Sequence, residues 1–264
     1  MSRSNPTVNT PSPCKRWLEF NGETGDLRYY DKQEKKNIVV HAKGFTFLLL
    51  DQLAVVKGWH EASESNIQSN EVRDTRVEPM LVKAFKGGKI AEGLYADIRD
   101  RVAAFGGHFV TNCYIGFRDA RNGPLQLGSI QFKGAALNSW VEFTKANRKE
   151  VYEQAVMITG SVDGKKGSVK FKTPTFTLVA VSPDTDVEAK ALDIELQEYL
   201  KGYFDRTRLA AIEHMAVGET PQETPDYDAE SEPTNFRTKP ASREAAKPAE
   251  ATTSDGYDDP TVPF

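Results

Sequence analysis

The sequence predicts a mainly β fold, a closed or partly closed barrel with helical additions, followed by a disordered acidic tail. Between residues 15 and 182, short β-branched or aromatic runs alternate with Gly, Pro, Asn and Asp. From Ala216 onward the chain is rich in Glu, Asp, Thr, Pro and Ala and has almost no aliphatic periodicity. Such a segment buries too little apolar surface to offset the entropy lost on ordering.

The first strands are expected near the N-terminus. "RWLEFNGETGDLRYYD" places two aromatic runs around a Gly-rich turn, which predicts a hairpin, and "NIVVH" follows it. Segment 45–56, "FTFLLLDQLAVV", is either a buried strand or a short helix, because Asp51 and Gln52 interrupt its apolar run. Later strands are predicted at "FVTNCYIGF", "LGSIQF", "QAVMITG", "GSVKFK" and "TFTLVAV".

Helical periodicity marks three segments. Residues 133–154 place Leu137, Trp140, Val141 and Phe143 at helical spacing, and "YADIRDRVAAFGG" predicts a second helix ended by its glycine pair. The third, "SPDTDVEAKALDIELQEYLKGYF", repeats an apolar residue every four positions from residue 192 to 204. We expect this helix to begin at an N-cap on Asp184 or Thr185, with Glu188 completing a capping box, and to pack on the barrel or on a second subunit.

Charge divides the chain at the same boundary as composition. Residues 216–264 hold 11 acidic and 4 basic residues, whereas residues 1–215 hold 27 acidic and 30 basic ones. The overall net charge of −4 therefore combines a mildly basic body with an acidic tail. We divide the chain into a disordered arm (1–14), a body (15–215) and a disordered tail (216–264) whose last ten residues form a distinct tip.

Several function classes lack their sequence signatures. There is no GxxxxGK[ST] loop, no GxSxG elbow and no HExxH pair, and no metal or other cofactor is expected. Cys14 and Cys113 show no CxxC or zinc spacing, which favours free thiols in a reducing cytoplasm. No apolar stretch is long enough to cross a bilayer.

Basic and aromatic residues are interleaved on strands and loops, as in "VKAFKGGK", "YIGFRDARNG" and "DGKKGSVKFK". Proteins that bind single-stranded nucleic acid combine a basic surface for phosphates with exposed rings that stack on bases. The phosphate contacts are expected from Lys83, Lys86, Lys89, Arg118, Arg121, Lys165, Lys166, Lys170 and Lys172. The stacking candidates are Trp17, Tyr30, Phe85, Tyr114 and Phe117, each of which could instead fill the core.

The lysines of "DGKKGSVKFK" are the clearest basic group. They belong to one predicted hairpin, on which strand alternation sends Lys170 and Lys172 to one face and Val169 and Phe171 to the other. This pattern predicts an exposed basic wing with an anchored back.

The last residues, "DDPTVPF", resemble the acidic tip of bacterial single-stranded-DNA-binding proteins, in which aspartates precede a terminal Pro-Phe. Pro260 and Thr261 depart from that pattern, and the aspartates are fewer. The matching residues, together with the upstream acid of the tip, are Asp255, Asp258, Asp259, Val262, Pro263 and Phe264.

Phage-encoded members of that class share an OB-fold body, a disordered linker and an acidic tip ending in Phe. The resemblance implies a non-catalytic protein in the host cytoplasm that coats single-stranded DNA in replication, recombination and repair. It also implies that Phe264 recruits partner proteins, by placing its ring and carboxylate in a pocket beside basic residues.

Three alternatives remain at this point. Asp184, Glu188 and Lys190 resemble the acidic and lysine residues of metal-dependent nucleases, although helix capping explains both acids. The chain could also be an interaction or virion protein that binds no DNA, and the tail could serve only for solubility.

Overall fold

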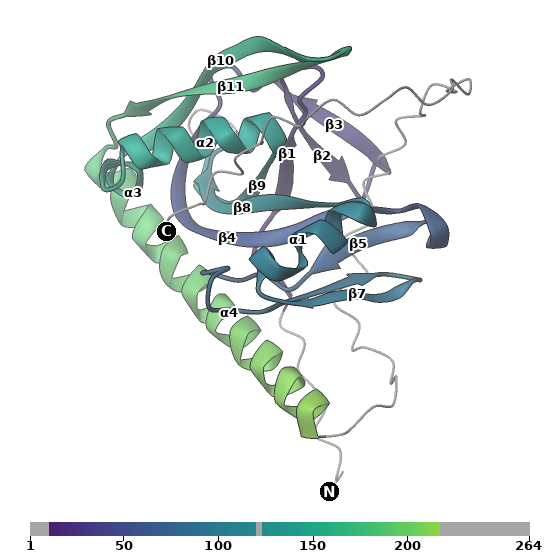
Figure 1. The fold of residues 1–264 in the computed structure, drawn as a ribbon. Coiled ribbons are helices and arrows are strands. Elements are labelled where there is room, and N and C mark those ends of the chain that lie inside the picture. Colours follow the sequence, from purple (N-terminus) through teal and green to yellow (C-terminus); the bar gives the residue numbers. More distant parts are fainter. Residues whose placement is uncertain (1–10, 120–122, 217–264) are drawn as a thin grey trace, which may run out of the picture.

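The architecture rests on one long strand, β4 (Thr46–His60), around which a mixed sheet is built in a computed structural model. The structure describes residues 11–119 and 123–216, with the backbone alone for 208–216. β4 pairs with β8 along most of its length, and its other edge is shared by β10 at one end and β5 at the other. Figure 1 shows β4 and β8 at the centre of the molecule. The other strands are β1 (Arg16–Phe20), β2 (Leu27–Asp31), β3 (Lys36–Val40), β5 (Ser65–Ser69), β6 (Met80–Ala84), β7 (Gly88–Gly93), β8 (Gly107–Phe117), β9 (Gln126–Lys133), β10 (Ala155–Lys166) and β11 (Val169–Val179).

The strand order is β3-β2-β1-β9-β8-β4-β5-β6-β7, with β10 joined to β4 and β11 joined to β10. All of these pairs are antiparallel except β1 with β9, which run parallel. The mainly β prediction is confirmed. The barrel is not confirmed, because the pairing among the described residues follows an open path with β3 and β7 at its ends.

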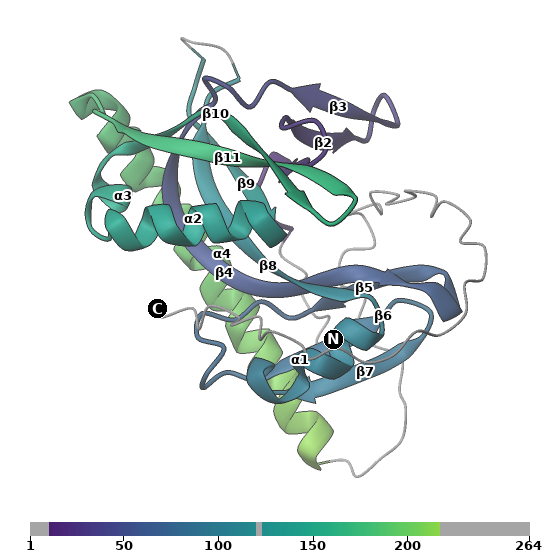
Figure 2. The ribbon, with the colours of Figure 1, turned by 45° about the horizontal axis from the view of Figure 1, so that its top comes forward.

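The main core lies between the sheet and α2 (Gly134–Ala146). The helix inserts Trp140, whose ring stacks on Phe132 of β9 at 5.2 Å between centroids and whose Nε1 donates to the Gln52 side chain at 3.2 Å. Figure 2 shows α2 and the β10–β11 hairpin on the same side of β4 and β8. The predicted helix over 133–154 is therefore present but divided, since the chain turns at Asn147 before the short α3 (Glu150–Glu153).

A second apolar cluster lies under α1 (Tyr95–Ala104). Its buried residues Ile98 and Val102 face Val56 of β4 and Val82 of β6. The helix ends where predicted, because Gly106 adopts a positive φ of 86° that is unfavourable for other residues. A single 3-10 turn, η1 (Glu61–Ser63), joins β4 to β5.

The third predicted helix is α4 (Pro183–Ala216), the long helix that crosses one side of the molecule in Figure 1. Its start differs from the prediction, because the Ser182 hydroxyl accepts the Thr185 backbone N–H at 3.3 Å. Ser182 is therefore the capping residue, one position before the proline that opens the helix, where proline is well tolerated.

β4 continues through Asp51 and Gln52, where the sequence suggested a break. The register shifts between Leu49 and Asp51, which marks a β-bulge, and both polar side chains find distant partners. Asp51 binds Arg73 at 2.7 Å and Gln197 of α4 at 3.2 Å, while Gln52 accepts the Trp140 N–H. Tertiary contacts therefore satisfy the polar groups that were expected to end the strand.

Candidate nucleic-acid interface

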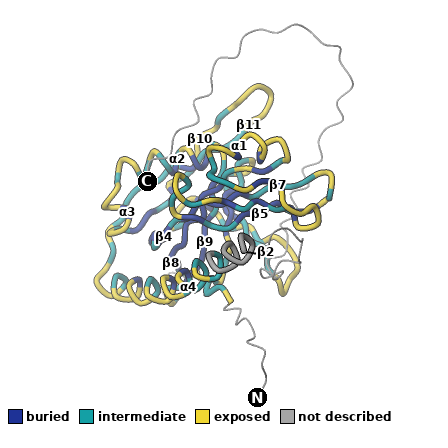
Figure 3. The backbone as a smooth tube through the Cα atoms, turned by 60° about the horizontal axis from the view of Figure 1, so that its bottom comes forward, coloured by how far each residue is buried: buried dark blue, intermediate teal, exposed yellow. Residues whose placement is uncertain are grey.

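One face of the sheet is only partly covered. On the side opposite α2, Leu196 and Leu200 of α4 are fully buried against Leu53, Tyr114 and Leu127 from three neighbouring strands. Figure 3 shows α4 lying along this side, with its outer surface exposed and the strands behind it buried. We call the part of this face under α4 the covered half and the remainder the open half.

Glu71, a half-buried acid, fastens the covered half. Glu71 accepts hydrogen bonds from Asn112 Nδ2 at 2.7 Å and from the Tyr114 hydroxyl at 2.6 Å, while its backbone N–H donates to the Tyr203 hydroxyl of α4 at 2.7 Å. Burial raises the pKa of the Glu71 carboxyl, and the two hydrogen bonds oppose that shift. The helix is thus held to the sheet by polar contacts as well as by apolar ones.

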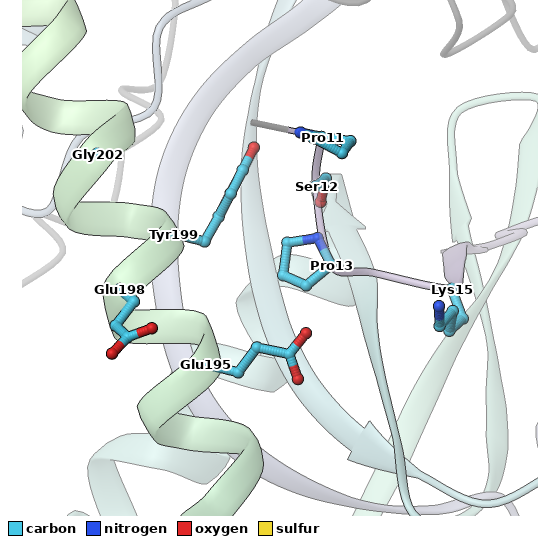
Figure 4. A pocket seen from close by; sticks show the side chains of 8 residues that line it. All are labelled: Pro11, Ser12, Pro13, Lys15, Glu195, Glu198, Tyr199 and Gly202. Carbon is cyan, nitrogen blue, oxygen red and sulfur yellow. The ribbon is translucent and has the colours of Figure 1, made fainter. Parts of the chain in front are cut away.

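Residues 11–15 run beside α4 at the edge of the covered half, and Tyr199 extends from the helix toward them (Figure 4). Cys14 packs against the cluster under α4, and burial raises the pKa of its thiol to about 12. The described end of the predicted disordered arm is therefore in contact with the body. A shallow pocket between arm and helix is lined by Pro11, Ser12, Pro13, Lys15, Glu195, Glu198, Tyr199 and Gly202, and its two glutamates make it unsuitable for an anion.

The open half carries a row of polar side chains that crosses five strands. Register pairs Lys57 with His108 on one side and with Gln68 on the other, then Gln68 with Lys83 and Lys83 with Lys89. Paired residues on neighbouring strands share a face, and Lys57 alternates with the core residue Val56. We call His108, Lys57, Gln68, Lys83 and Lys89 the basic row.

The basic row contains a pair of like charges that should destabilise the sheet. Lys83 lies directly opposite Lys89, and like charges in that position destabilise a sheet. Glu92 binds Lys89 at 3.1 Å and offsets part of this repulsion. Burial lowers the pKa of Lys83, and the charge of Lys89 adds to the effect.

A second group of charges continues the open half toward β2. Glu19 binds Arg28 at 3.1 Å and Lys133 at 2.7 Å, so one acid holds two cations. Lys133 lowers the pKa of His108, although burial is the larger cause. Register places the two groups close together, because Lys133 pairs with Val110, two residues beyond His108 on the same face of β8.

Aromatic side chains flank these cations. Trp17 is 37% exposed on β1 and meets Tyr114 edge-on at 6.3 Å between centroids, and Tyr30 is half-buried on the same face of β2. Trp59 lies two residues beyond Lys57 and is also half-buried. Phe85 is 75% exposed in the β6–β7 turn beside Lys86. Half-buried and exposed rings thus lie on the strands and the turn that carry the cations.

The predicted basic wing is a second surface. The β10–β11 hairpin is present, and it places Lys165 directly opposite Lys170, with Lys166 beside them at the tip. Lys172 binds Asp163 at 2.7 Å, three pairs from the tip, and its backbone N–H donates at 2.6 Å to the Gly22 carbonyl in the turn between β1 and β2, which anchors this end of the hairpin. On the other face the Phe171 ring lies close against Gly164.

Three predicted contacts are corrected by the structure. Tyr114 and Phe117 are almost fully buried, Tyr114 under α4 and Phe117 in the main core, so neither ring is available to a base. Arg118 binds Glu188 of α4 at 2.9 Å and also donates to the Gly123 carbonyl, so its role is to attach the helix. Strand register decides these three cases, and a single sequence does not supply it.

The nuclease residues lie in the first two turns of α4. Glu188 binds Arg118 and accepts the Leu125 backbone N–H at 3.2 Å, whereas Lys190 binds Asp186 at 2.6 Å. Asp184 is exposed at the helix start. The role of Glu188 is therefore to attach the helix to the sheet, in place of the capping role that the sequence predicted.

Two groups of predicted residues fall outside the described part of the chain: Arg121 and the tip 255–264. Conversely, Lys57, His108, Gln68 and Trp59 were missed. Their signal was the alternation in "AVVKGWH", where Val55, Lys57 and Trp59 share one face, but an isolated lysine after an apolar run attracts less attention than a lysine cluster.

None of the helices in the described part of the chain combines the length and the apolar character needed to cross a bilayer. Over the same residues, no three His, Cys, Asp or Glu side chains gather as metal ligands would. Comparison with protein-family models, with curated proteins and with solved structures gave no match, so the proposal that follows rests on the residues and geometry given above.

Proposed function

We propose that this chain is a non-catalytic protein that binds single-stranded DNA along the open half of its sheet. The observation that carries the proposal is the basic row, in which three lysines and a histidine from four strands share one solvent-facing surface. Trp17, Trp59 and Phe85 supply rings for stacking beside it. Such a surface contacts phosphates and base faces, so it binds with little sequence preference.

An OB-like body is part of the proposal. OB folds bind oligonucleotides on a strand face flanked by loops, and here the basic row crosses a strand face beside the β6–β7 turn. The β10–β11 hairpin, with Lys165, Lys166 and Lys170, would add phosphate contacts from a second surface. Such a protein would coat and protect single strands during phage replication or recombination.

The test is a titration of labelled oligo-dT and of a duplex of equal length at several salt concentrations. We expect preference for the single strand, and an affinity that falls with salt with a log–log slope of about −0.7 for each phosphate bound. Equal affinity for the duplex, or insensitivity to salt, would contradict the proposal. Magnesium-dependent loss of the strand would favour the nuclease alternative, and absence of binding at low salt would favour an interaction or virion protein.

The C-terminal tip gives the proposal its second part, the recruitment of replication and recombination proteins through Phe264. A pull-down with wild type and with Phe264→Ala tests it, because the substitution removes the ring and keeps every charge. If the ring is an anchor in a pocket, the substitution should weaken partner binding by about 2 kcal/mol or more and leave DNA affinity unchanged. An identical partner set for both proteins would reduce the tail to a solubilising segment.

A further inference from the structure

Lys57 is unusual among the cations of the open half. It is half-buried on β4, and burial lowers the pKa of its ammonium group. In the described part of the chain it makes no hydrogen bond or ion pair, whereas Lys133 and Lys89 each have an acidic partner. A cation removed from water without a partner costs free energy, so its retention calls for an explanation.

The acids that attract Lys57 are engaged elsewhere. Glu71 and Glu19 both raise the pKa of Lys57 through their charges. The Glu71 carboxylate, however, accepts from Asn112 and Tyr114, and Glu19 binds Arg28 and Lys133. Both carboxylates therefore stabilise Lys57 only through space.

The Lys57 side chain is only partly shielded from solvent. The residue is half-buried, and its cross-strand neighbours His108 and Gln68 are exposed. No fully buried side-chain nitrogen or oxygen among the described residues lacks a hydrogen-bond partner, so the unpaired Lys57 nitrogen is not completely enclosed. Lys57 is thus a partly desolvated cation at the surface of the sheet, where attraction to an anion is stronger than for a fully exposed lysine.

The register supplies further donors around this cation. His108 and Gln68 are the direct cross-strand neighbours of Lys57, and both side chains are exposed. Each can present an N–H toward the same space, the imidazole from β8 and the amide from β5. Trp59, the next residue of β4 on this face, offers a ring within reach of the same position.

We propose that Lys57, His108 and Gln68 form a binding site for a phosphate group, and that its natural occupant is a backbone phosphodiester of single-stranded nucleic acid. The choice of occupant rests on the proposed function, while the site itself depends only on the local geometry. Three donors from three adjacent strands suit an anion with several acceptor oxygens, and Trp59 would stack on the base attached to that phosphate.

The main test compares Lys57→Met with Lys145→Met, which removes an exposed lysine on the far side of the molecule, in α2. Lys57→Met should weaken oligo-dT binding roughly tenfold, as expected when one hydrogen bond to a charged group is removed, and reduce the salt slope by about 0.7. Its Tm should stay the same or rise, because an unpaired, partly desolvated charge has been removed. Lys145→Met should change neither affinity nor slope to this extent.

A lowered Tm for Lys57→Met, or an affinity and slope equal to those of wild type, would overturn the site while leaving the proposed function intact. Gln68→Ala provides a second variant, since this exposed side chain can be removed without threatening the fold. It should weaken oligo-dT binding in the same direction.

A titration with inorganic phosphate distinguishes a nucleic-acid phosphodiester from a free phosphate compound as the natural ligand. Added phosphate should shift the NMR signals of the His108 ring in wild type and not in Lys57→Met. If oligo-dT fails to bind wild type but phosphate shifts His108, the proposed function is wrong and the site serves a free phosphate compound. If neither probe affects wild type, both proposals are wrong.

Discussion

The covered and open halves of the same sheet face differ in how their side chains are partnered, although β4 and β8 run through both. In the covered half, Leu53 packs with Leu196 in one apolar cluster, and both oxygens of the half-buried Glu71 carboxylate accept hydrogen bonds, from Asn112 and Tyr114. In the open half, Lys57 has no partner among the described residues and Lys83 faces Lys89. The covered half is thus arranged for packing, whereas the open half keeps an unpaired cation and two facing lysines that stability alone does not explain.

The largest effect should come from the covered half. Leu196 has 0% exposure, so Leu196→Ala should lower the free energy of unfolding by about 2–5 kcal/mol, because apolar burial is reduced and a cavity remains. Ile194 is the matched control, because it lies two positions away on the same helix and is 63% exposed. Urea denaturation measures both variants, and an equal decrease for Ile194→Ala would show that α4 does not bury this face.

The open half should show the reverse behaviour. The double variant Lys83→Gln/Lys89→Gln should keep or slightly raise the stability, because two like charges no longer face each other. Its oligo-dT salt slope should fall by about 0.7 for each phosphate that is no longer bound. The control Lys145→Gln/Lys149→Gln removes two exposed lysines, one in α2 and one just before α3, on the other side of the sheet. An unchanged slope in the first variant would remove the distinction between the two halves.

The smallest effect concerns pH. Burial is the main cause that lowers the pKa of His108 below its ordinary 6.5, and the charge of Lys133 is the second cause. Lys57 lies opposite His108 on β4, and Glu19 binds Lys133. A bound phosphate would raise that pKa again, so binding should take up a proton. Oligo-dT affinity should therefore increase as pH falls below about 6.5, by several-fold at most, and His108→Asn should flatten this dependence. Equal pH profiles for the two proteins would exclude His108 from the interface.

Local pattern was sufficient for the elements with strong periodicity. The repeat of Leu196 and Leu200 predicted an amphipathic helix packed on the body, and the glycine in "GKKGSVKFK" predicted the hairpin. Both signals lie within one segment of chain. They need no knowledge of what the segment touches.

The remaining features depend on distant residues. Asp51 stays in a strand because Arg73 and Gln197 bind it, and Phe117 is in the core because of its register with Phe47. The basic row likewise exists only after five strands are aligned, since its members are scattered from residue 57 to residue 108. Composition predicted a basic, aromatic surface, but not which residues form it.

The parallel pairing of β1 with β9 imposes an order on biosynthesis. Arg16 aligns with Gly128, more than one hundred positions later, so the β1–β3 meander leaves the ribosome long before β9, the second neighbour of β1, exists. During that interval the nascent meander exposes Leu18, Phe20 and Leu27, which are later fully buried. Contacts of such high sequence separation slow folding and leave strand edges open to other chains. β1, though made first, thus gains its second neighbour only after β9 has been synthesised.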